Sequence, residues 1–329
     1  PIKVQGDSEE ILEFIEKFDK LNKSSSKQVE LGAIMSKYGR AYELLVIQES
    51  KILSAIVDVK SAFIVFDKSI FNNKLSGVRY VLNDDDSEKY TLDIEVYTNK
   101  FTIILNVECS YDEDKDIIES IDDVLSCSIE VHGFRYIPLL ELKNNEMRQG
   151  DFEIVIPLID SYDVIMSDTL NGYGDLSNEF LHLDANLGAE VTENTAKSLK
   201  DANIVATSPS VTEEGAVIPT KLQYISRNFN FSNIESHLNN INQEIVKASL
   251  TPDISDSSFG GTQTGQSLRY KMTYLDQSFN IKKSIHSEYL IEKYKTAYLT
   301  IANTLDSDLE ELLNEFDSLE IIHSKNIPT

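Results

Sequence analysis

The sequence predicts an α+β fold with more than one subdomain, and three observations support this prediction. Apolar residues recur at helical spacing near both ends of the chain, and short alternating runs follow one another between residues 42 and 107. The chain has 329 residues, which exceeds the size at which one hydrophobic core usually stops growing. Hydrophobic residues make up 41% and charged residues 26%, as in ordinary globular proteins.

Two helices are expected at the start of the chain. The first covers residues 7–21 and is capped by Asp7 or Ser8. Three serines at 24–26 are expected to end it, and a second, shorter helix covers 28–38. The apolar face of the first helix consists of Ile11, Leu12, Ile15, Phe18 and Leu21.

The next region predicts a meandering antiparallel sheet. Its apolar or alternating runs are separated by polar turns, as expected for such a sheet. A helix is expected over 114–125, with its acidic start stabilised by the helix dipole. A strand–turn–strand follows over 129–142. The predicted strands of the meander cover 42–48, 61–67, 77–83, 90–99 and 101–107.

The second half of the chain predicts long helices around an irregular segment. Pro157 suits the first turn of a helix that continues to about residue 180. Short apolar runs then predict a small α/β insertion over 181–230. The remaining expected elements are helices over 231–250, from 266 or 268 to about 302 and over 306–316, and a strand over 319–323.

Several kinds of chemistry find no support in the sequence. The five histidines are dispersed, and Cys127 with His132 lacks the second pair of ligands that a zinc site needs. The chain contains no G-x-S-x-G or H-E-x-x-H motif, so no catalytic, metal or cofactor residue is assigned. Cys109 and Cys127 are expected to be reduced structural thiols. No apolar run reaches transmembrane length.

An acidic stretch has part of the spacing of a calcium-binding EF-hand loop. Asp112, Asp114 and Asp116 alternate, and Asp123 occupies the final position. The sixth position should be glycine but is Ile117, and the last ligand is not the bidentate glutamate of that motif. The acidic start of a helix explains these residues more simply.

The formal net charge of −25 limits how this protein interacts with nucleic acid. A protein that grips phosphates carries a basic patch, whereas this chain repels DNA on average. The charge argues against a tight DNA binder. It is compatible with a conduit whose wall must not hold the DNA that passes, and also with a purely solubilising role.

A polar loop over 252–265 separates two of the predicted helices. Its skeleton G-x-x-x-x-G-x-S resembles a phosphate-binding P-loop, but Gln266 replaces the decisive lysine. No buried strand leads into it, so nucleotide binding is rejected. The loop residues of interest are Asp253, Asp256, Ser258, Phe259, Gly260, Gly261, Thr262, Gln263, Thr264 and Gly265.

Four short segments carry a further signal. They read YGRAYELL from Tyr38, NN at 144–145 with GDFE from Gly150, IDSYD from Ile159 with SD at 167–168, and FGG followed by TGQSLRYK from Thr264. In this order they resemble motifs of the portal proteins of tailed double-stranded DNA bacteriophages, especially the class from phages of Gram-positive bacteria. The fourth segment departs from the family, whose helix starts with Ser-Gly-x-Ala.

The resemblance implies a portal-like division of the chain. Residues 1–156 correspond to the first part of an α/β wing, 157–180 and 231–250 to two stem helices, and 181–230 to a clip. Residues 251–265 correspond to the tunnel loop and 266–329 to the return into the wing. The C-terminal crown of the family has no counterpart before Thr329.

The resemblance also implies a function and partners. The family forms a ring, usually a dodecamer, at one capsid vertex of the virion, and it is assembled in the host cytoplasm. Double-stranded DNA passes through the ring without sequence specificity during packaging and ejection. The partners implied are terminase, the major capsid and scaffolding proteins, and later a head-completion or tail adaptor protein. No enzyme activity, cofactor or membrane partner is implied.

Within this reading, Arg269 and Lys271 are the residues expected to contact phosphate, although exposed helix charges explain them equally. Asp253 and Asp256 are then expected to face the channel. Two rival classes stay open: another capsid, connector or baseplate protein without a DNA channel, and an enzyme that uses scattered carboxylates.

Overall fold

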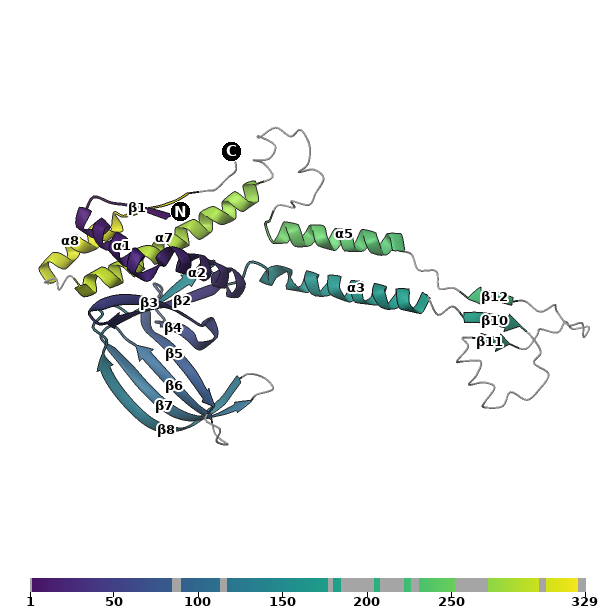
Figure 1. The fold of residues 1–329 in the computed structure, drawn as a ribbon, viewed down its shortest axis with the longest axis horizontal. Helices are drawn as coiled ribbons and strands as arrows, with labels where there is room; N and C mark the ends of the chain where they lie inside the picture. Colours follow the sequence, from purple (N-terminus) through teal and green to yellow (C-terminus); the bar gives the residue numbers. More distant parts are fainter. Residues whose placement is uncertain are drawn as a thin grey trace, which may run out of the picture. The chain divides into compact units, whose positions relative to one another are not determined.

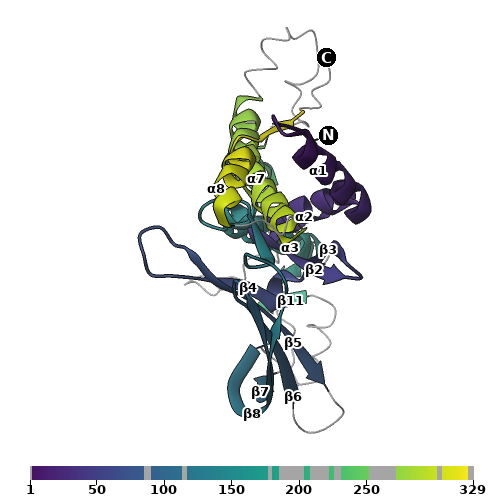
Figure 2. The ribbon, with the colours of Figure 1, turned by 90° about the vertical axis from the view of Figure 1, so that its left-hand side faces the viewer.

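A computed structural model describes most of the chain and divides it into two compact units (Figures 1 and 2). The first unit contains Pro1–Ile154 and Ile254–Thr329, and the second contains Val155–Asp253. The mixture of helices and strands confirms the α+β class. The residues described are 2–84, 90–112, 117–176, 180–184, 204–207, 222–225, 231–251, 272–301 and 306–324.

A three-stranded antiparallel sheet lies at the centre of the first unit. β2 (Arg40–Gln48) pairs with β3 (Lys51–Val57) on one side and β9 (Leu139–Lys143) on the other. The two residues between β2 and β3, Glu49 and Ser50, both have positive φ, as a tight type I′ hairpin requires. β3 was not predicted, because its mixed polar and apolar sequence alternates only over a short stretch.

Helices cover one face of this sheet and contribute the largest core. α1 (Glu9–Asn22), α2 (Ser24–Tyr38) and α7 (Thr273–Ile301) contact β3, β2 and β9. The core between them joins apolar residues from α1, α2, β2, β9, α7 and α8 (Asp306–Asp317). Helical periodicity therefore predicted these helices correctly.

The joint between α1 and α2 differs from the prediction. Ser24, Ser25 and Ser26 belong to the first turn of α2 instead of breaking the chain. Lys23 alone makes the corner, because its left-handed conformation (φ 51°) ends one helix and begins the next. Serine is favoured in the first turn of a helix as well as in loops, so the sequence pattern was ambiguous.

The second sheet of this unit is a five-stranded antiparallel meander in chain order. The prediction of a meander is confirmed. The more polar of its two faces carries apolar side chains near β4, and these pack against the central sheet. They form a second core that includes Tyr42, Ala62, Ile64, Tyr97 and Leu139. The strands are β4 (Ala62–Phe66), after the short helix η1 (Val59–Ser61), β5 (Lys74–Asp84), β6 (Tyr90–Tyr97), β7 (Phe101–Asp112) and β8 (Ile117–Val131).

The helix predicted over 114–125 is wrong, because residues 117–131 form β8. β8 pairs with β7 along its whole length, with register shifts that absorb extra residues. Isoleucine and valine favour strands. The pairing partner is the long strand β7, and the acidic residues from which a helix was predicted give no information about this pairing. The predicted strand–turn–strand over 129–142 is confirmed only at its ends, where β8 finishes and β9 begins.

The two ends of the described chain form a small sheet of their own. β1 (Ile2–Gln5) pairs antiparallel with β13 (Glu320–His323). α8 and β13 match the predicted elements, whereas β1 was missed. The predicted start of the long C-terminal helix, at 266 or 268, lies outside the described residues.

The second unit contains two helices and three short strands. α3 (Ile156–Leu176) and α5 (Phe231–Ala248) lie side by side (Figure 1). α3 ends at Leu176, and Phe180 already belongs to a strand, so the predicted helix was slightly too long. β10 (Phe180–Asp184) lies between β11 (Ile204–Thr207), which is parallel, and β12 (Leu222–Ile225), which is antiparallel.

Among the described residues, α3 and the other helices are all too short or too polar to cross a membrane.

The first unit buries a histidine whose ionisation opposes folding. His286 of α7 contacts Gln28 Oε1 through Nε2 at 2.6 Å, and its ring lies 5.2 Å from the ring of His323. Burial, followed by the nearby His323 and Lys293, lowers the pKa of His286 to about 4. Between pH 4 and 6.5 the unfolded chain therefore binds a proton that the folded chain does not.

We expect the free energy of unfolding to fall as the pH is lowered from 7 to 4.5, by about 2 kcal/mol from His286 alone. His286→Gln should flatten this dependence in denaturant titrations, because glutamine does not titrate. The matched control is His237→Gln on exposed α5, which should keep the wild-type slope. An unchanged slope in His286→Gln would contradict the assignment.

Candidate functional site

Two of the sequence motifs meet in a polar junction at the end of α2. Gly39 ends this helix with φ +78°, and its carbonyl accepts a hydrogen bond from Asn144 N at 2.9 Å. Asp151 N donates to the carbonyl of Ser36, also at 2.9 Å. The turn over 144–153 therefore closes the C-terminal end of α2. We call Ser36, Gly39, Asn144, Gly150, Asp151 and Lys282 the motif junction.

Both glycines of the motif junction are required by close backbone contact. A Cβ atom on Gly39 would lie 1.9 Å from Arg148 O, and one on Gly150 would lie 2.8 Å from Lys37 O. Real Cβ atoms do not approach backbone oxygens this closely, so any side chain would push the turn away from the helix. The glycine of each motif is thus explained by packing.

Asp151 binds three other residues of the motif junction. Its carboxylate accepts hydrogen bonds from Ser36 Oγ, Asn144 Nδ2 and Lys282 Nζ, which come from three different elements. Burial alone would raise the pKa of Asp151, but the bonds from Lys282, Ser36 and Asn144 outweigh it and lower the pKa. The charged carboxylate therefore joins α2, the turn and α7.

The turn is further stiffened from within. Arg148 donates two hydrogen bonds to Glu141, of 2.8 and 3.0 Å, and Gly150 N donates to Glu153 Oε2. Asn145 bonds both the N–H and the carbonyl of Gln149. This stiff segment stands immediately before Val155, where the second unit begins.

A buried ion pair links the first motif to α7. Lys293 Nζ donates to Glu43 Oε1 at 2.8 Å, and Tyr289 Oη donates to the other carboxylate oxygen. The side chains of Glu43 and Lys293 are both 0% exposed. Burial, and then the charge of Glu43, raises the pKa of Tyr289. Because no substrate can reach these groups, their role is structural.

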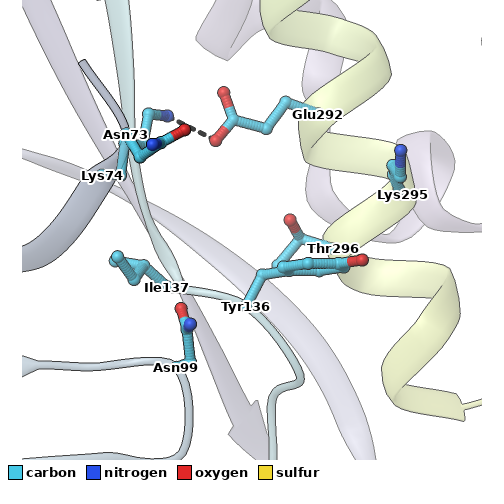
Figure 3. A pocket seen from close by; sticks show the side chains of 8 residues that line it. All are labelled: Asn73, Lys74, Asn99, Tyr136, Ile137, Glu292, Lys295 and Thr296. Atoms are coloured by element: carbon cyan, nitrogen blue, oxygen red, sulfur yellow. Dashed lines mark hydrogen bonds and ion pairs between the residues drawn. The ribbon is translucent and has the colours of Figure 1, made fainter. Parts of the chain in front are cut away.

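A cavity of about 350 Å³ opens beside α7 (Figure 3). It is lined by both polar and apolar side chains, among them Asn99, Tyr136 and Thr296. Its single carboxylate, Glu292, is in an ion pair with Lys74. The lining therefore offers no pair of carboxylates for acid–base chemistry.

Metal chemistry finds no support in the part of the chain that the structure describes. No group of three or more His, Cys, Asp or Glu side chains in this part could hold an ion. Asp112 and Asp123 lie in β7 and β8, so they do not belong to a calcium loop. Cys109 and Cys127 are free thiols; the first is buried and the second is exposed.

The residues predicted from the sequence as a channel site lie outside the described residues. These are the loop positions Asp253 to Gly265 together with Arg269 and Lys271. The structure instead shows that Lys282, Tyr289 and Lys293 of α7 bind the carboxylates of Asp151 and Glu43. The sequence had not indicated this role for them. No local pattern marks them, because polar residues are spread along the whole of α7.

The comparison with protein families is decisive. The family model described as "Phage portal protein, SPP1 Gp6-like" matches residues 1–328. The chain belongs to this portal protein family. The resemblance stated from the four motifs is therefore confirmed, including its link to phages of Gram-positive bacteria.

A curated portal relative agrees with the family assignment. The portal protein of Bacillus phage SPP1 is 21% identical to this chain over 294 residues, which cover 85% of the chain and 54% of the relative. The chain thus spans about half the length of this relative.

We expect Gly39→Ala to lower the free energy of unfolding by at least about 2 kcal/mol, because it combines a clash with a disfavoured backbone conformation. Gly32→Ala is the matched control, since it lies within α2 with open space around it. That change should be neutral or stabilise by up to about 1 kcal/mol. Equal stability of the two variants, measured by denaturant titration, would contradict the role of the motif junction.

Proposed function

We propose that this chain is a subunit of a ring-shaped portal channel at one capsid vertex, through which double-stranded DNA is packaged and later ejected. The observation that carries the proposal is the family match over nearly the whole chain. The paired helices of the second unit support it, because two adjacent helices per subunit, repeated around an axis, can form the wall of a channel.

In this proposal the chain divides as the resemblance implied. Residues 1–156 and 266–329 form the wing, and the grouping of both ends of the chain in one compact unit supports this. α3 and α5 supply the stem helices over 157–180 and 231–250. The strands β11 and β12 fall within the clip, 181–230, and β10 begins one residue before it, at Phe180. Residues 251–265 form the tunnel loop.

The charges of α3 and α5 suit a surface along which DNA slides. The two helices together carry six carboxylate residues and one lysine, Lys247. Asp160, Asp163 and Asp168 of α3 are exposed. Such a wall repels phosphates and gives them no strong binding points, so DNA can move past it.

α3 also carries an apolar face that suits contact with another subunit. Ile156, Ile159, Leu170 and Tyr173 share one side of the helix, and all four are exposed. Exposed apolar rows of this kind mark interaction surfaces. In a ring, the neighbouring stem supplies a surface of the same kind, so these side chains support oligomer formation.

Partners follow from the same proposal. The clip docks terminase during packaging and a head-completion or tail adaptor afterwards, while the wing contacts scaffolding and major capsid proteins. Arg269 and Lys271 contact DNA phosphates as they pass. The protein needs no cofactor, assembles in the host cytoplasm and remains in the virion.

The proposal is tested by the native mass of the purified protein, alone and with its scaffolding protein, and by negative-stain imaging of the same sample. We expect annular particles with a mass near that of twelve chains, because closed cyclic symmetry is needed for a channel. A monomer under both conditions would contradict the ring and favour another virion role.

Replacing Arg269 and Lys271 together by glutamate should lower the yield of packaged DNA while rings remain intact, because phosphate contacts are replaced by repulsion. The matched control reverses two exposed lysines of the wing, Lys51 and Lys100, and should package normally. Packaged DNA is measured by nuclease protection. A wild-type yield in the double variant would remove these residues from the channel.

A further inference from the structure

The five-stranded sheet of the wing has one apolar and one polar face. The pairing register places Phe63, Val78, Val96, Ile103 and Ile129 in one row across all five strands. The rows of Tyr80, Ile94 and Leu105 and of Leu82, Leu92 and Val107 lie on the same face. An antiparallel sheet of this kind normally buries its apolar face against another layer.

Only the middle of this apolar face is buried within the chain. Leu92, Val107 and Cys109 are buried, but Phe101 at the start of β7 and most of the part on β8 are open to solvent. Ile129 is 65% exposed and Val131 74% exposed, and β8 lies at the edge of the sheet. We call this open part the acceptor patch: Phe101, Ile121, Val124, Cys127, Ile129 and Val131.

A second unusual feature lies at the other edge of the same sheet. The turn between β4 and β5 presents Ile70 and Phe71, which are 96% and 86% exposed. Two adjacent apolar side chains at a turn tip are unfavourable in water. We call residues 67–73 the donor turn.

The donor turn is held in one conformation. Asp67 accepts hydrogen bonds from Ser69 N, Ser69 Oγ and the N–H and side chain of Asn73. These bonds, those from Ser69 foremost, lower the pKa of Asp67. At the base of the turn Lys74 is paired with Glu292 of α7 (Figure 3). Ile70 and Phe71 are therefore preorganised, which reduces the entropy lost when they bind a surface.

The donor turn and the acceptor patch cannot serve each other within one chain. β4 and β8 are the two opposite edges of the sheet. Figure 2 shows the hairpin after β4 projecting away from β7 and β8. Two different surfaces on opposite sides of a subunit are what a head-to-tail contact needs, and such contacts generate rings when they close.

We propose that the donor turn of one copy packs Ile70 and Phe71 onto the acceptor patch of the next copy around the ring. This inference rests on the proposed ring and names an interface within it. Charge also favours this occupant: exposed Lys68 belongs to the donor turn, while the edge strand β8 carries Glu119, Asp123 and Glu130 on its face opposite to the acceptor patch and has no lysine or arginine. Opposite charges on the two edges steer the approach of one copy to the next.

The chain carries a convenient probe, because Cys127 lies exposed in the acceptor patch and Cys109 is buried. Phe71→Cys, treated with a short bismaleimide at assembly concentration, should give a ladder of covalent oligomers beyond the dimer. Mass spectrometry should identify the link between positions 71 and 127. Phe71→Cys with Cys127→Ser should lose the ladder, and Val29→Cys, at an equally exposed position on α2, should give at least tenfold less of it.

The outcomes separate this interface from the ring itself. Rings of normal mass without a link between 71 and 127 would overturn the interface and leave the portal function standing. Dimers alone, linked between identical positions, would indicate a two-fold contact and overturn it equally. A full ladder combined with failure to package DNA would support the interface and count against the channel function.

Discussion

The buried contact of Glu43 with Lys293 and Tyr289 is the constraint on which the first unit depends. Its partners lie 250 residues apart, one on the central strand β2 and the other on α7. Moving two charges out of water is costly, so only an arrangement that satisfies both carboxylate oxygens is stable. α7 therefore fits the sheet in one position, and the returning chain is fixed in register.

A second polar contact fixes the same helix about 16 Å away, since Lys282 and Lys293 are eleven residues apart on one face. Lys282 reaches Asp151, in the turn just before the chain leaves the first unit. The turn before the chain leaves the first unit is thus tied to α7 by charge-assisted bonds.

The five-stranded sheet is only partly covered by the rest of the first unit. Its polar face completes a core with the central sheet, whereas its apolar face is closed only in the middle. The exposed side chains on β8 and at the turn before β5 contribute little to the isolated subunit. In the interface that we propose, burial against a neighbouring copy makes them favourable, because the hydrophobic effect follows the apolar area removed from water.

By itself, the sequence determined the helices and most of the meander, because apolar periodicity reports local burial in α1, α5 and α8 and along β4 to β7. It also identified the glycines, asparagines and Asp151 of the motif junction through their resemblance to a family. Tertiary structure alone decided the rest. β8 was mistaken for a helix and β1 was missed, because each becomes a strand through a partner elsewhere in the chain. The same holds for Glu43 and Lys293, since charge partners 250 residues apart leave no local pattern.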